Sequence, residues 1–106
     1  MQDAMEAFKQ GLDHVRRSEF EHAVEAFTKA IELDPELAIA YDARGAVFTL
    51  MGNTDQGIAD CNEAIRLAPK EAKFYRTRCL VFRDVGEQAK AEADLAKSEE
   101  LGITRD

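Results

Sequence analysis

This sequence of 106 residues contains little of what several broad protein classes require. Its two cysteines are too few for a disulfide framework, and its two prolines and six glycines do not indicate a fibrous or disordered chain. No apolar run approaches the roughly 20 residues that cross a bilayer, and the first residues lack the basic start and apolar run of a signal peptide. We therefore expect a folded, soluble protein in the cytoplasm.

Basic residues are also scarce in this chain. Lys and Arg number 14 against 21 Asp and Glu, which gives a net charge of -7. Because Lys and Arg supply most of the affinity for nucleic acids and anionic membranes, this balance argues against both as partners. Apolar residues make up 45% of the sequence, which suffices for a modest core.

What the sequence does contain is a repeat with a period of 34 residues. Pro35 and Pro69 lie 34 positions apart, and a third copy follows in which Ile103 replaces the proline. The same shift superimposes several further pairs, namely Gly11 and Gly45, Ala30 and Ala64, Ile31 and Ile65, Leu33 and Leu67, Tyr41 and Tyr75, and Gly52 and Gly86. Such a period is typical of stacked structural repeats.

The segment 18–35 shows how one repeat is built. Ser18 and Glu21 have the spacing of a capping box at a helix start. Apolar residues then recur every three or four positions, which predicts a helix with one face packed against a partner. We expect Phe27 on this face to be a core spacer between repeats. Pro35 ends the segment and suits the first turn of a new helix, so another helix should begin there.

Each repeat predicts two helices joined by a short turn, so we expect an all-α protein of six helices without a strand. The first helices of the three repeats are expected at 3–16, 36–51 and 70–85, and the second helices at 19–33, 55–67 and 87–101. The turns are marked by Ser18, Gly52 and Gly86, and Gly102 is the expected final cap.

The pattern within each unit resembles the tetratricopeptide repeat. Small residues recur in the first helix at Gly11, Gly45 and Cys79 and in the second at Ala23, Gly57 and Ala91, each of the latter followed by Phe27, Cys61 or Leu95. The family's usual tryptophan is replaced by Ala7, Tyr41 and Tyr75. The resemblance spans 4–102 and implies a right-handed α-solenoid of one domain, with repeats at about 4–37, 38–71 and 72–105. It also implies a concave groove that binds peptides or partner proteins.

Some members of this family grip the acidic C-terminal tails of chaperones with a carboxylate clamp. The clamp uses lysine and asparagine from the first repeat, asparagine from the second, and lysine and arginine from the third. The corresponding residues here are Phe8, Leu12, Ala43, Lys73 and Thr77. Only Lys73 matches, so we expect no chaperone-type clamp.

Residues of the first helices that face away from the partner helix predict the lining of the groove. They are Met5, Phe8, Leu12, Arg16, Asp42, Ala46, Thr49, Lys73, Arg76, Leu80 and Arg83. The set changes from apolar to basic along the array, and Arg78 adds to the basic end. We hypothesise an extended peptide with an apolar anchor near Phe8 and an acidic residue or terminal carboxylate near Lys73 and Arg76. Two alternatives stay open: the apolar residues pack against a neighbouring segment, or the basic face is solvated and binds nothing.

Catalytic and metal-binding interpretations find little support in the sequence. His14 and His22 fall on different predicted helices and not at the i, i+4 spacing of metal ligands. Cys61 and Cys79 occupy packing positions that could lie near each other, without an evident activating base. We therefore expect no enzyme, cofactor or metal. The alternative function is self-assembly into a homodimer through terminal helices, or a regulatory role within a larger protein; light scattering separates monomer from dimer.

Overall fold

The computed structural model describes residues 2–102, which form six helices and no strand. The helices are α1 (Ala4–Arg16), α2 (Phe20–Leu33), α3 (Ala38–Leu50), α4 (Thr54–Leu67), α5 (Ala72–Asp84) and α6 (Gln88–Gly102). The all-α class and the helix order predicted from the sequence are confirmed, and each boundary differs from its expected position by no more than two residues.

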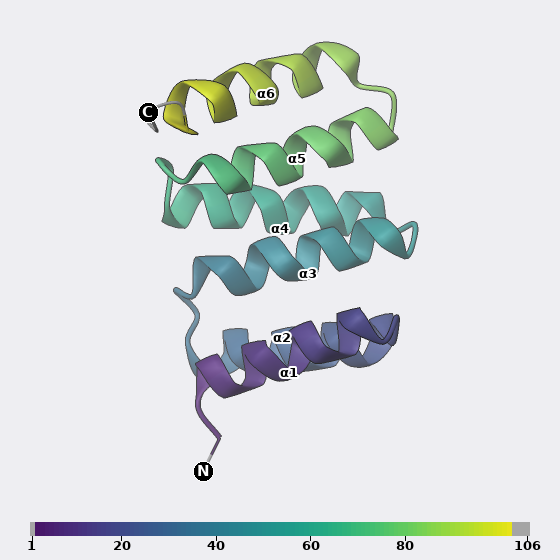
Figure 1. Ribbon diagram of the computed structural model, residues 1–106, viewed down its shortest axis with the longest axis vertical. Helices are drawn as coiled ribbons and strands as arrows, with labels where there is room; N and C mark the ends of the chain where they lie inside the picture. Colours follow the sequence, from purple (N-terminus) through teal and green to yellow (C-terminus); the bar gives the residue numbers. More distant parts are fainter. Residues whose placement is uncertain (1, 103–106) are drawn as a thin grey trace.

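The helices form three pairs, α1 with α2, α3 with α4, and α5 with α6. Neighbouring pairs join through α2 against α3 and α4 against α5, and α3 also contacts α5. Figure 1 shows the pairs stacked along the long axis, from α1 and α2 (purple and blue) to α6 (yellow). The array is a helical solenoid whose first helices α1, α3 and α5 share one layer, and this layer carries the groove described below.

Small residues allow the two helices of a pair to approach closely. A Cβ atom added at Gly11 would overlap the ring of Phe27, and one at Gly57 would overlap the hydroxyl of Thr49 and lie 3.0 Å from the carbonyl oxygen of Gly45. Phe27 is fully buried and packs with Ala23 and with Val47 of the next pair. It is thus a core residue that joins the first two repeats, as the sequence predicts.

The turn before α2 differs from the prediction. Ser18 has a φ of 59° and lies in the left-handed region, whereas the N-cap of α2 is Glu19, which forms no side-chain capping bond. Gly52 and Gly86 have φ angles of 87° and 81° at the equivalent positions of the later repeats. The predicted capping box at Ser18 is therefore wrong, because this position must reverse the chain and is better suited to glycine.

A capping box is instead present at the start of α1. The backbone N–H of Glu6 donates to Asp3 Oδ1 at 2.8 Å, and the backbone N–H of Asp3 donates to Glu6 Oε1 at 3.0 Å. The side chains of Asp3 and Glu6 therefore satisfy two donors at the exposed end of the first helix.

Two details of the repeat ends also differ from expectation. Helix α3 begins at Ala38, three residues after Pro35, and the hydroxyl of Tyr41 donates back to the carbonyl oxygen of Pro35 at 3.0 Å. The hydroxyl of Tyr75 donates in the same way to Pro69 at 2.8 Å. Gly102 lies within α6, and residues 103–105 of the expected third repeat lie outside the described residues.

A half-buried arginine ties the second repeat to the first. The guanidinium of Arg44 on α3 donates to both carboxylate oxygens of Asp60 on α4, with Nε to Oδ2 at 2.8 Å and Nη2 to Oδ1 at 2.9 Å. Its Nη1 donates to Thr28 Oγ1 on α2 at 3.1 Å. The guanidinium also lies near the rings of Tyr41 and Phe48, with centroid distances of 5.9 and 5.7 Å. One side chain thus joins three helices.

The same arrangement recurs 34 residues later around Arg78. Its Nε and Nη2 donate to Asp94 on α6 at 2.8 Å each, and its Nη1 donates to Asn62 on α4 at 2.8 Å. Contrary to the prediction, Arg78 does not add a free cation to the basic end of the groove, because the carboxylate of Asp94 holds it between helices.

Candidate peptide-binding groove

A pocket of about 240 Å³ lies across the first helices of all three repeats. Its lining comes from α1, α3 and α5, together with one ring from α2 beneath. The residues are Phe8, Leu12, Val15, Phe27, Asp42, Ala43, Ala46, Val47, Leu50, Lys73 and Thr77. Because the central helix contributes the small side chains of Ala43 and Ala46 between bulkier apolar groups, there is room for an apolar ligand side chain.

Two further pockets extend this space along α3 and α5. One of about 200 Å³ is lined by Ala46, Thr49, Leu50, Thr77, Leu80 and Val81, and one of about 490 Å³ by Thr49, Leu50, Leu80, Arg83 and Asp84. Shared lining residues make the three pockets one continuous groove. Leu50 and Leu80 stand along it with 64% and 56% of their surface exposed, which leaves large apolar side chains facing solvent.

The structure places eight of the eleven predicted site residues along this groove. These are Phe8, Leu12, Asp42, Ala46, Thr49, Lys73, Leu80 and Arg83. The other three, Met5, Arg16 and Arg76, are exposed and do not line these pockets. Arg16 forms an ion pair with Asp13 on its own helix. That any of the eleven binds a ligand stays a prediction.

Leu50 is the main groove residue that the sequence analysis missed. It is the most exposed large apolar side chain among the described residues and lines all three pockets. A signal was available, because Leu50 follows Ala46 by four positions and so shares its helix face. Its place at the last residue of α3 obscured this relation.

Asp42 lies in the groove but is buried, with only 3% of its surface exposed. Burial raises its pKa above the ordinary 3.8, and the charge of Glu71 acts in the same direction, while the Thr77 hydroxyl and the Lys73 ammonium act against it. Since the folded state holds this proton more tightly than the unfolded state, the free energy of unfolding falls as the pH rises from 3.8 through the raised pKa. Ionisation of Asp42 therefore destabilises the fold.

The two cysteines do not form a reactive site. Cys61 and Cys79 are both buried free thiols. Burial raises the pKa of Cys61 to about 12, and the negative charges of Asp42 and Asp60 add to this effect. Because the thiolate is the reactive form, Cys61 is unreactive near neutral pH.

The two histidines lie closer together than the sequence suggested. His14 on α1 and His22 on α2 have ring centroids 5.3 Å apart, and His14 Nδ1 lies 2.7 Å from Glu19 Oε1. The hydrogen bond to His14 lowers the pKa of the exposed Glu19 carboxyl. Within residues 2–102, no group of three or more His, Cys, Asp or Glu residues could hold a metal ion.

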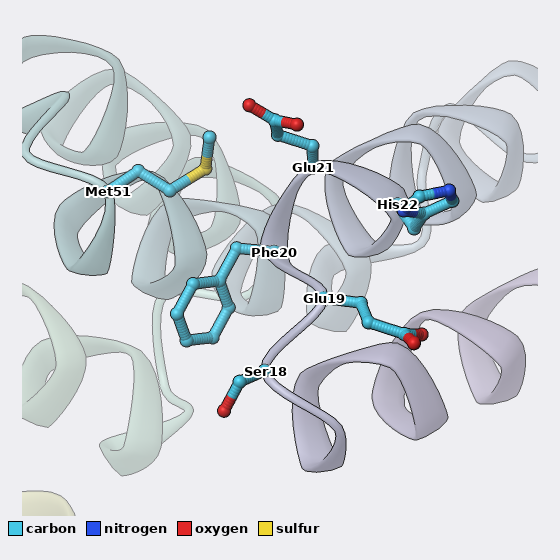
Figure 2. A pocket seen from close by; sticks show the side chains of 6 residues that line it. All are labelled: Ser18, Glu19, Phe20, Glu21, His22 and Met51. Carbon is cyan, nitrogen blue, oxygen red and sulfur yellow. The ribbon is translucent and has the colours of Figure 1, made fainter.

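A separate depression of about 460 Å³ lies at the turn between α1 and α2. It is lined by Ser18, Glu19, Phe20, Glu21, His22 and Met51. Figure 2 shows the side chains of Phe20 and Met51 near each other, while Glu19 and Glu21 point in different directions. Because its polar groups do not converge, this depression is a weaker candidate than the groove.

No helix in the described part of the chain combines the length and the apolar character that a bilayer crossing requires.

Comparisons with known sequences find tetratricopeptide repeats both in a family profile and in a related protein. The profile of the Tetratricopeptide repeat family matches residues 18–37 and 38–71, just over half of the chain. The TPR repeat-containing thioredoxin TDX of Arabidopsis thaliana is 30% identical over 99 residues, which cover 93% of this chain and 26% of that protein. The chain thus spans about a quarter of the length of this relative.

Comparisons with solved structures show the same architecture. The TPR2B domain of yeast Sti1, in a complex with pHsp70, superimposes with a TM-score of 0.92 at 29% identity and covers 96% of this chain and 82% of that one. The first TPR of Spaghetti (RPAP3), bound to the HSP90 peptide SRMEEVD, has a TM-score of 0.92 at 20% identity, covering 98% and 82%. Because the identity to the first TPR of Spaghetti is only 20%, this second similarity shows the fold alone.

Proposed function

Because this chain belongs to the tetratricopeptide repeat family, we propose that it is a non-enzymatic adaptor that binds a peptide or partner protein in the groove of α1, α3 and α5. The observation that carries this proposal is the continuous groove with Leu50 and Leu80 exposed along it. The similar domain of yeast Sti1 was solved in a complex with pHsp70, which supports a polypeptide as the occupant.

The groove favours a ligand with two chemical parts. Phe8 and Leu12 on α1, with Ala46 on α3, form an apolar section that suits an apolar side chain. Lys73 and Arg76 on α5 are both exposed and carry positive charge. An acidic residue or a C-terminal carboxylate of the ligand therefore belongs toward α5.

Charge reversal at α5 tests this orientation. The chain with Lys73→Glu and Arg76→Glu should bind the peptide acetyl-Ala-Leu-Ala-Ala-Asp, with a free C-terminal carboxylate, at least about tenfold more weakly, because hydrogen bonds between charged groups are lost. Calorimetric titration measures the affinity, and circular dichroism checks that the helices are intact. The matched control reverses Lys9 and Lys29, which are exposed on α1 and α2. Equal binding by the α5 variant and the parent would contradict the orientation.

The side chains at the clamp positions support a groove without a chaperone-type carboxylate clamp. At the positions that correspond to the clamp, Phe8, Leu12 and Ala43 line an apolar pocket. The hydroxyl of Thr77 donates to the carbonyl oxygen of Lys73 at 3.1 Å, so only the ammonium of Lys73 offers a clamp-like contact. We propose that this adaptor does not use such a clamp.

The peptide SRMEEVD, which is bound to the first TPR of Spaghetti, provides the test. The parent chain should bind it weakly. Introducing Phe8→Lys, Leu12→Asn, Ala43→Asn and Thr77→Arg together should raise the affinity at least about tenfold, because each adds a donor to the peptide's carboxylates. Fluorescence polarisation with a labelled peptide measures both, and the C-terminal amide of the same peptide is the control. If the parent itself binds SRMEEVD tightly and binds the C-terminal amide at least about tenfold more weakly, the absence of a clamp is refuted.

A further inference from the structure

We infer that Asp42 accepts a hydrogen bond from a main-chain N–H of the bound peptide, beside the residue whose apolar side chain fills the groove. This inference rests on the proposed function, because it assigns a role to one side chain within the same groove. The inference goes beyond the proposed function because it names a polar contact that selects how the peptide backbone lies across α3.

The first observation is an unsatisfied oxygen. Only 3% of the surface of Asp42 is exposed, and its Oδ1 atom has no hydrogen-bond partner among the described residues. A buried carboxylate oxygen without a donor is costly, and most buried polar atoms have a partner. Asp42 belongs to the lining of the central pocket, so a ligand that displaces the neighbouring side chains there can supply the missing donor.

The neighbouring groups of the protein leave this oxygen without a donor. The Thr77 hydroxyl interacts with the Asp42 carboxyl and lowers its pKa, but it also donates to the carbonyl oxygen of Lys73, and Oδ1 has no partner. The side chain of Lys73 lines the same pocket but forms no ion pair with Asp42 in the described part of the chain. Lys73 is exposed on a flexible stem, so it can move aside when a ligand enters.

The chemistry of the pocket selects a neutral N–H group as the donor. A carboxylate only accepts hydrogen bonds, so the ligand group that pairs with the ionised form of Asp42 must donate. The positive charge of Lys73 disfavours a second cation at this point, and the surrounding apolar side chains of Leu12, Val15 and Ala46 make a charged ligand group costly to bury. A main-chain N–H accompanies every apolar side chain of a peptide and carries no net charge.

Backbone methylation provides the experiment. The probe is acetyl-Ala-Ala-Leu-Ala-Ala-amide, compared with two versions that are methylated on the leucine nitrogen or on the nitrogen of the next residue. Titrations are followed by NMR on the isotope-labelled full chain and on two variants. Asp42→Ala removes the acceptor, and Asp55→Ala removes an exposed acid from the first turn of α4 with the same change in charge.

We expect one of the two methylated peptides to bind the parent chain roughly tenfold more weakly than the unmethylated probe. This difference should persist in Asp55→Ala and vanish in Asp42→Ala. A further variant, Asp42→Asn, keeps an acceptor oxygen and should retain part of the difference.

Two other outcomes would overturn the inference in distinguishable ways. If all three peptides shift the groove signals of the parent with equal affinity, or if the loss on methylation persists in Asp42→Ala, the role of Asp42 is refuted and the adaptor function stands. If none of the peptides shifts the signals of Phe8, Leu12 or Ala46, the groove does not bind apolar peptides, and both proposals fail.

Discussion

Truncation of Phe27 to alanine is expected to lower the free energy of unfolding by about 3–5 kcal/mol, the usual cost of removing a buried aromatic ring. The ring is fully buried, fills the space above Gly11, and lies 5.6 Å from the ring of Phe8 between centroids. It also packs against Val47 of the second repeat. The loss therefore weakens both the first helix pair and its junction with the second pair. The expected change is a large fraction of the free energy of unfolding of a typical domain, which is roughly 5–15 kcal/mol.

Urea denaturation followed by circular dichroism measures the Phe27 effect. The control is Leu50→Ala, which also removes a large apolar side chain but at a position that is 64% exposed. Leu50→Ala should change the free energy of unfolding by no more than about 0.5 kcal/mol, while weakening the binding of apolar peptides. A Phe27→Ala chain as stable as the Leu50→Ala chain would refute the role of Phe27 as the spacer between repeats.

The fold could be predicted because the same pattern of residues recurs every 34 positions in the sequence. The 34-residue shift that aligns Gly11 with Gly45 also fixes the helix pairs, and small residues at these positions dictate close helix contact. The turn at Ser18 was misread because serine is a common helix cap. Comparison with Gly52 and Gly86 one and two periods later would have indicated its left-handed conformation, with φ of 59°, 87° and 81° at the three positions.

The candidate site was less predictable than the fold. Helical periodicity was sufficient to place Phe8, Leu12 and Leu80 along the groove. It did not reveal that Asp42 is buried, because that depends on how closely α5 approaches α3. Nor did it separate Arg78 from the free cations, because its partner Asp94 lies on the following helix, 16 residues later. The sign of a charge does not show which side chain neutralises it.

The ion pair between Arg44 and Asp60 leads to the second large prediction. The two side chains are only 19% and 9% exposed, and two hydrogen bonds of 2.8 and 2.9 Å join them. Asp60→Ala should lower the free energy of unfolding by about 3 kcal/mol, because it leaves the guanidinium between helices without its carboxylate. Arg44→Ala should have a similar effect, since it strands the carboxylate and also removes the bond to Thr28.

Replacement of both partners should be much less harmful than either single change. In a chain with Arg44→Met and Asp60→Leu, no charge is left unpaired and the apolar side chains can pack with Tyr41 and Phe48. Urea denaturation of the parent, the single variants and the double variant measures the coupling. Arg66→Ala, which breaks the exposed pair with Glu63, is the control and should leave the unfolding midpoint unchanged. If the double variant loses as much stability as the two single variants combined, the arginine stabilises the stack through its own packing and not through its charge partner.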